Sequence, residues 1–428
     1  MKNVCVIACL LSMIVGVSFA GPMDRIAEAY VKLVLAVGQH DPDYVDAYYG
    51  PPEWREAAEK KKKPLGVILS EAESFIAELD TLRVSNPSDP MANLRREYLS
   101  HQLSSLDARV QILQGKKFTF DEESRLLYDA VAPKYSADHF RTILRKLDPL
   151  LPGKGTLQHR YEEFRKRFII PKEKLDTVFK AAIQECRRRT REHIELLPDE
   201  SFTVEYVTNK PWGGYNWYKG NDRSVIQVNT DLPSYIDRAI DLAAHEGYPG
   251  HHVYNSLLED QLVKKRGWVE FTVYALFSPQ SLIAEGSANY GVHVVMTDQE
   301  KTLFERRVLF PLAGLDTGQT EKYNKVTLLV QELSYAGNEA ARGYLDGTMS
   351  RDSAAKWLEE YELMTPERAQ KRLDFVERYR TYIINYNLGE DLVRKYIESR
   401  SQTVQQRWAE FEKLLSSPRL PSGLTVGR

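Results

Sequence analysis

The chain has 428 residues, of which 43% are hydrophobic, and its formal net charge is −2. This length and apolar content are enough for a large buried core, either in one large domain or in two tightly packed halves. The nearly neutral charge excludes the strongly basic surface that recruits nucleic acid, so we expect no nucleic-acid partner.

Residues 1–20 have the pattern of a secretory signal peptide. Lys2 precedes an apolar run, and Ser18-Phe19-Ala20 offers small residues at both positions of the cleavage signal. We predict cleavage after Ala20 and a periplasmic or secreted mature protein. The apolar run is shorter than the roughly 20 residues of a membrane span, so we expect no stable span in the mature chain. Cys186 would then be its only cysteine, which excludes an internal disulfide.

Residues 21–200 form a predicted N-terminal helical half. Apolar residues recur there at helical spacing, and Ser, Asp and Pro separate the segments. We predict helices at about 23–37, 69–82, 91–113, 121–131, 137–147, 157–168 and 172–197. The segment His40–Pro52 is rich in turn formers and aromatic residues. We interpret it as a capped loop near the entrance of a site, because metal-ligand spacing is absent.

The pattern changes at Ser201, where a predicted C-terminal catalytic half, residues 201–428, begins. Phe202–Val207 and Ser224–Thr230 alternate polar and apolar residues, which predicts a small β-sheet. Such a sheet either offers an edge strand to an extended peptide or is a purely structural hairpin, and the alternation favours neither. Further helices are expected at about 288–307, 321–345 and 354–363, and then over 366–389.

The segment His245–His252 carries three histidines and a glutamate inside what is otherwise a buried helical pattern. Buried polar groups are costly unless something binds them, which indicates a metal. In the zinc signature His-Glu-x-x-His the two histidines share one helix face. Here His251 would lie about 120° from His245 on an ideal helix. Pro249 and Gly250 can distort the helix into a bulge that brings His251 into place, and His252 is the alternative ligand.

Glu285 is the candidate third ligand, from a later helix with little other charge. Two histidines and one glutamate leave a coordination position open, as in catalytic zinc sites. The competing interpretation of Glu285 is a buried glutamate paired with an arginine. Asp241 either orients a ligand or is an exposed helix charge, and His293 is expected to be packed rather than a ligand.

These residues resemble a known family. The string His245-Glu246-Gly247-Tyr248-Pro249-Gly250-His251-His252, followed by Glu285-Gly286, is similar to the bacterial family known as domain of unknown function 885. That family is regarded as gluzincin-type zinc metallopeptidases, distantly similar to carboxypeptidase Taq, neurolysin and angiotensin-converting enzyme.

The resemblance implies a mainly α fold, large and gluzincin-like, with a deep channel and a small β-sheet next to the metal helix. It further implies Zn²⁺ on His245, His251 and Glu285, with Glu246 as the general base. Arg378 and Tyr386 match family residues on a late helix and are candidate donors to the oxyanion. The family usually has proline and glycine where this chain has Ile384 and Asn385.

The expected function is that of a zinc metallopeptidase that acts on short or unfolded peptides. The resemblance suggests a carboxypeptidase or dipeptidyl carboxypeptidase. Two alternatives remain open, namely a zinc hydrolase of another amide or an ester, and a non-catalytic periplasmic binding protein on the same fold.

Overall fold

The structure is a computed structural model that describes residues 21–82, 89–210, 212–231 and 233–425. The predicted signal peptide, residues 1–20, lies outside the described residues. Among the described residues, no helix combines the length and apolar character that crossing a membrane requires.

The first part of the described chain is helical, as the apolar spacing predicts. Thr119 and Glu122 form a reciprocal capping box that fixes the start of α5. The predicted helix at 172–197 is shorter in the structure and ends at Arg191. The helices are α1 (Pro22–Gly38), α2 (Pro52–Lys60), α3 (Leu65–Thr81), α4 (Pro90–Leu113), α5 (Phe120–Tyr128), α6 (Ala137–Leu147), α7 (Leu157–Arg165) and α8 (Leu175–Arg191).

Two small sheets interrupt the helices. The first contains β2 (Ser201–Val207), β3 (Gly214–Tyr218) and β4 (Arg223–Asn229) in the order β2-β4-β3. Strand β2 runs parallel to β4, and β3 runs antiparallel to it, so β3 is an edge strand. The second sheet pairs β1 (Val45–Tyr48) with β5 (Val273–Ala275). The alternating pattern predicts β2 and β4 and leaves β1, β3 and β5 unpredicted.

The second part of the chain returns to helices. The predicted helix at 321–345 is two helices, α14 and α15, and the predicted helix at 288–307 is divided between α11 and α12. The helices are α9 (Arg238–Leu242), α10 (His251–Leu258), α11 (Pro279–Val295), α12 (Asp298–Phe304), α13 (Phe310–Ala313), α14 (Thr320–Gln331), α15 (Tyr335–Leu345), α16 (Arg351–Tyr361), α17 (Pro366–Tyr379), α18 (Ile384–Glu398) and α19 (Val404–Leu415).

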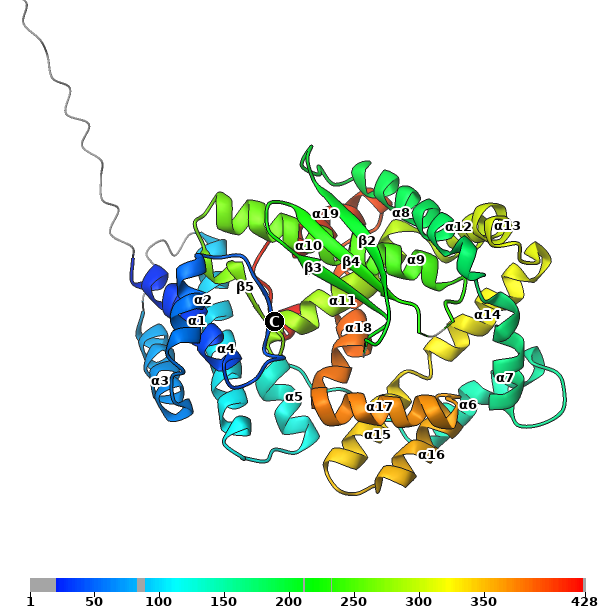
Figure 1. Cartoon of the computed structure of the whole chain (residues 1–428), viewed down its shortest axis with the longest axis horizontal. Helices are drawn as coiled ribbons and strands as arrows, with labels where there is room; N and C mark the ends of the chain where they lie inside the picture. Colours follow the sequence, from blue (N-terminus) through cyan, green and yellow to red (C-terminus); the bar gives the residue numbers. More distant parts are fainter. Residues whose placement is uncertain (1–20, 83–88, 211, 232, 426–428) are drawn as a thin grey trace, which may run out of the picture.

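Helices α11 and α18 lie side by side near the middle of the molecule (Figure 1). Helix α11 is buried along almost its whole length, which explains why its apolar residues are not confined to one face. The two backbones touch at Gly286 and Gly389. A β-carbon added to Gly286 would lie 2.3 Å from the carbonyl carbon of Gly389, so only glycine permits this approach.

One hydrophobic core joins the two predicted halves, since a single cluster of buried side chains extends from Ile26 to Leu424. The boundary at residue 200 marks the start of β2, where helices give way to the sheet. The predicted mainly α fold with a small β-sheet is confirmed. The deep channel of the family stays a prediction.

Candidate metal centre

The histidine motif breaks its helix as Pro249 and Gly250 predict. After α9 the chain makes a wide π-helical turn over Ala243–Gly247, leaves the helix, and begins α10 at His251. The Gly250 amide closes the turn by donating to the carbonyl of Ala244 at 2.8 Å. A β-carbon on Gly250 would lie 1.9 Å from the carbonyl oxygen of His245, so the turn requires glycine.

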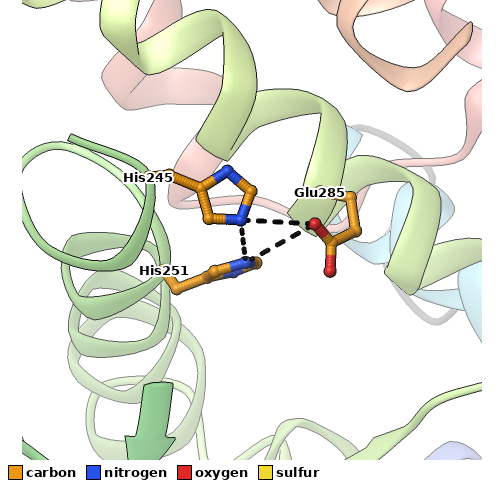
Figure 2. Close-up of side chains that lie close together, drawn as sticks. All are labelled: His245, His251 and Glu285. Carbon is orange, nitrogen blue, oxygen red and sulfur yellow. Dashed lines mark hydrogen bonds and ion pairs between the residues drawn. The ribbon is translucent and has the colours of Figure 1, made fainter. Parts of the chain in front are cut away.

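This turn brings His245 and His251 together with Glu285 from α11 (Figure 2). The two Nε2 atoms are 3.1 Å apart. Glu285 Oε2 lies 3.4 Å from Nε2 of His245 and 3.8 Å from Nε2 of His251. Ligand atoms held tetrahedrally at roughly 2.0–2.1 Å from one zinc ion stand roughly 3.3 Å from one another. The three side chains are therefore spaced as ligands of a single ion.

Glu285 supplies a second indication of a metal. Its Oε1 accepts a hydrogen bond from the Tyr382 hydroxyl at 2.8 Å, whereas the buried Oε2 has no hydrogen-bond partner in the described part of the chain. A buried carboxylate oxygen without a partner is costly, and a cation between it and the imidazoles would remove that cost. Among the described residues no arginine pairs with Glu285, so the competing interpretation of a Glu–Arg pair does not fit.

The carboxylates and imidazoles of the cluster shift one another's pKa. Burial opposes a charge on His245, but Glu285, Glu246 and Asp241 together raise its pKa to about 9. Burial would likewise raise the pKa of Glu285, yet His245 and His251 hold it well below its usual range. Glu285 is therefore ionised at neutral pH, as a metal ligand must be.

Asn289 orients the first histidine. Its Oδ1 lies 2.8 Å from Nδ1 of His245, so Nδ1 donates and Nε2 faces the cluster. The Asn289 amide also donates to the carbonyl of Tyr386 at 2.8 Å, which ties α11 to α18. Asp241, a candidate for this orienting role from its sequence position, pairs with Arg238 instead. Asn289 lies one helical turn after Glu285, and that spacing is the signal that could have identified it.

Replacing Asn289 by alanine is expected to weaken zinc affinity by about 10–100-fold, because His245 loses the partner that fixes its ring. Affinity is measured by competition with a chromophoric chelator. Asn338→Ala is the matched control, since it removes a buried amide on α15 that bonds to Asn387 outside the cluster. Equal affinities for the two variants would contradict the orienting role.

His252 lies outside the cluster, and the structure therefore favours His251 as the ligand. The ring is 1% exposed and both of its nitrogens are occupied. Nδ1 is 2.9 Å from Ser224 Oγ on β4, and Nε2 is 3.0 Å from Glu200 Oε2. Glu200 also accepts hydrogen bonds from Tyr248 and Arg187, so His252 belongs to a network that fastens the motif to the sheet.

Glu246 lies beside the cluster, buried beneath β3. The residue is 4% exposed, and its backbone carbonyl accepts a hydrogen bond of 2.7 Å from Asn216 on β3. Its Oε1 is 3.0 Å from the position that a β-carbon of Gly214 would take. Burial raises the pKa of Glu246, although His245 and His251 partly offset this effect. A raised pKa suits a carboxylate that must accept a proton near neutral pH.

The two candidate oxyanion donors lie in different surroundings. Arg378 is half exposed and binds Asp43 through both Nε, at 2.8 Å, and one terminal nitrogen, at 2.6 Å, so it is not brought to the cluster. Tyr386 remains near it, because its ring packs 5.7 Å from that of Tyr382, the residue bonded to Glu285. Burial and the charges of Glu285 and Glu246 raise the pKa of Tyr386 well above its usual range.

Two other histidines have structural partners, as expected. His293 faces Glu390 at 3.3 Å and Asp298 at 3.6 Å. His40 bonds to the carbonyl of Lys63 at 2.7 Å. Tyr382 and Asn289 stand in no motif, so the sequence alone does not reveal them.

The fold and this site define a mainly helical protein with a candidate centre of two histidines and one glutamate. No protein-family model matches the chain, and no curated protein sequence does. Among solved structures, the chain is similar to a "putative lipoprotein" from Colwellia psychrerythraea, with a TM-score of 0.53 and 14% identity over 84% of this chain and 68% of that one. A "putative lipoprotein of unknown function" from Shewanella oneidensis gives a TM-score of 0.47 and 12% identity over 96% and 79%. The first likeness shows a shared fold, and the second adds no argument.

Proposed function

We propose that this chain is a zinc-dependent metallopeptidase of the family known as domain of unknown function 885. The observation that carries the proposal is the convergence of His245, His251 and Glu285 at zinc-ligand spacing, with the buried Oε2 of Glu285 lacking a hydrogen-bond partner among the described residues. Two histidines and a carboxylate also occur in iron(II) oxygenases. The buried Glu246, directly after the first ligand, favours hydrolysis because it provides a general base.

In this proposal His245 and His251 would hold the metal through Nε2, and Glu285 through Oε2. Zinc, when bound, would supply Lewis-acid polarisation of the scissile carbonyl and acidify water. Glu246 would accept the proton of the attacking water and pass it to the leaving nitrogen. The Tyr386 hydroxyl would donate to the oxyanion, whereas Arg378, the other candidate, is bound to Asp43 in this structure.

The edge strand β3 supports a peptide as the substrate. The backbone amide of Lys219 donates to the carbonyl of Arg223 at 2.9 Å, and the backbone amide of Asn229 donates to the carbonyl of Gly213 at 3.0 Å. Because hydrogen-bonded pairs alternate along an antiparallel ladder, the backbone groups of Gly214 and Asn216 point away from β4. An extended peptide could pair with that side of β3, directly over Glu246.

The proposal includes export of the protein. The signal-peptide pattern of residues 1–20 supports it, as does the fold shared with a protein described as a lipoprotein. Carboxypeptidase or dipeptidyl carboxypeptidase action rests on the family resemblance alone.

The test is peptide hydrolysis by the purified mature protein, with its metal content measured in parallel. We expect about one zinc per chain, cleavage of short peptides seen by mass spectrometry, and a loss of at least about 100-fold after chelation that zinc restores. Zinc without peptide cleavage, but with ester or other amide hydrolysis, would replace the peptidase with another hydrolase. A chain that takes up no zinc would overturn the proposal in favour of a binding protein, and bound iron would favour an oxygenase.

A further inference from the structure

A cavity lies beside α7 and against α14, away from the candidate metal centre. Helix α7 is at the right edge of the molecule in Figure 1, whereas α11, which carries Glu285, is near the middle. The cavity has a volume of about 400 Å³, within the roughly 300–1,000 Å³ of small-molecule sites. Basic side chains dominate its lining, in which the charged or titratable residues are Lys154, His159, Arg160, Glu163, Arg167 and Lys322.

Residues 151–154, in the loop before α7, form one side of the cavity, and Arg160 holds this loop in place. One terminal nitrogen of Arg160 binds Asp148 Oδ1 at 2.5 Å, and the other donates to the carbonyl of Leu151. The loop turns at Gly153 and Gly155, whose φ angles of 147° and 93° favour glycine. This side of the cavity is therefore built by specific contacts, and Asp148 already offsets the charge of Arg160.

Two cations from different elements lie against one aromatic ring of this lining. The guanidinium carbon of Arg167 is 5.0 Å from the centre of the Phe164 ring, and Nζ of Lys322 on α14 is 5.5 Å from it. Arg167 Nε also donates to the carbonyl of Phe164 at 3.3 Å. An aromatic ring attracts cations, so Phe164 holds two like charges beside the same cavity although they repel each other.

These positive charges have no counter-charge of their own. Glu163, the acidic residue of the lining, pairs with Lys166 at 2.6 Å. Within the described ranges, no carboxylate lies at ion-pair distance from Lys154, Arg167 or Lys322. The whole chain has 60 acidic residues against 58 Lys and Arg, so three unpaired cations around one cavity are a local excess. An anion inside the cavity would offset this excess.

We propose that this cavity binds the phosphate group of a small molecule. A phosphate monoester carries a charge of about −1.5 to −2 at pH 7 and three strong acceptor oxygens, which suits several converging cations better than a single carboxylate would. Arg167 can bind the phosphate through two nitrogens, and Lys154 and Lys322 add point charges. The volume leaves space for the rest of the molecule. This inference goes beyond the proposed function and does not depend on it.

The experiment titrates glycerol 3-phosphate into the purified mature protein by calorimetry, with glycerol and with sodium chloride at equal ionic strength as ligand controls. We expect saturable binding of glycerol 3-phosphate alone. Lys322→Gln and Arg167→Gln should each weaken it by about 10–100-fold, the usual range for hydrogen bonds to a charged group. Lys325→Gln is the matched control, because Lys325 lies one turn further along α14 and does not line the cavity. It should keep the wild-type affinity.

His251→Ala separates the cavity from the metal centre, since a phosphate can also bind a metal ion. We expect this variant to bind glycerol 3-phosphate as the wild type does. Binding that is lost in His251→Ala but kept in Lys322→Gln would place the phosphate at the centre and overturn the inference. Equal weakening in Lys322→Gln and Lys325→Gln, or no saturable binding by the wild type, would overturn it as well. None of these results affects the proposed peptidase, whose test is hydrolysis.

Discussion

Replacing His251 by alanine is expected to remove stoichiometric zinc, whereas replacing His252 by alanine leaves the zinc in place. His251 Nε2 lies 3.1 Å from Nε2 of His245 and faces Glu285, whereas both His252 nitrogens are bonded to Ser224 and Glu200. The loss of a ligand should exceed the 10–100-fold that an orienting partner contributes. The measurement is metal content after gel filtration, beside a thermal unfolding curve for each variant.

The two variants should also differ in stability. His252→Ala leaves the buried Glu200 and Ser224 short of a partner, which costs about 1–3 kcal/mol of unfolding free energy. In the metal-free state His251→Ala should lose less stability than His252→Ala, because the His251 ring contacts His245 and Glu285 and takes no part in the Glu200 network. Zinc lost in His252→Ala and retained in His251→Ala would reverse the ligand assignment.

Replacing Glu246 by glutamine is expected to lower kcat by about 10²–10⁴-fold, the usual contribution of a general base. Glutamine has nearly the shape of glutamate but cannot accept the proton, so zinc content and KM should change little. The control is Glu259→Gln, which alters a buried carboxylate bonded to Tyr218 and Asn221 at the end of α10. This control should lower stability without the loss of kcat.

Both outcomes of the Glu246 experiment are informative. A Glu246→Gln variant that keeps its zinc and its turnover would show that the base is another group. A variant that loses its zinc would instead show that Glu246 acts on the metal.

The sequence predicts the centre of this site well because its signal is local. A proline and a glycine inside a helical pattern mark a break, and the break explains how histidines six positions apart can meet. The choice between His251 and His252 is not local. It depends on β4 and Glu200, which occupy the nitrogens of His252, and no spacing within the motif reveals those partners.

The residues that the sequence does not reveal are those that act between distant elements. Tyr382 and Asn289 matter because α18 and the turn before it pack on α11. Arg378 illustrates the reverse case. Its position in a family-like pattern indicates catalysis, but a bidentate bond to Asp43 occupies it.

The contact between Gly286 and Gly389 couples two parts of the sequence that a motif search would treat separately. A side chain at either position would push α18 away from α11, and Tyr382, Tyr386 and the Asn289 bond would move with it. Divergent relatives could therefore substitute neighbouring residues, but a substitution at either glycine would require a wider spacing between α11 and α18. A search for such relatives should pair the histidine motif with both glycines, since the three features together describe one geometry.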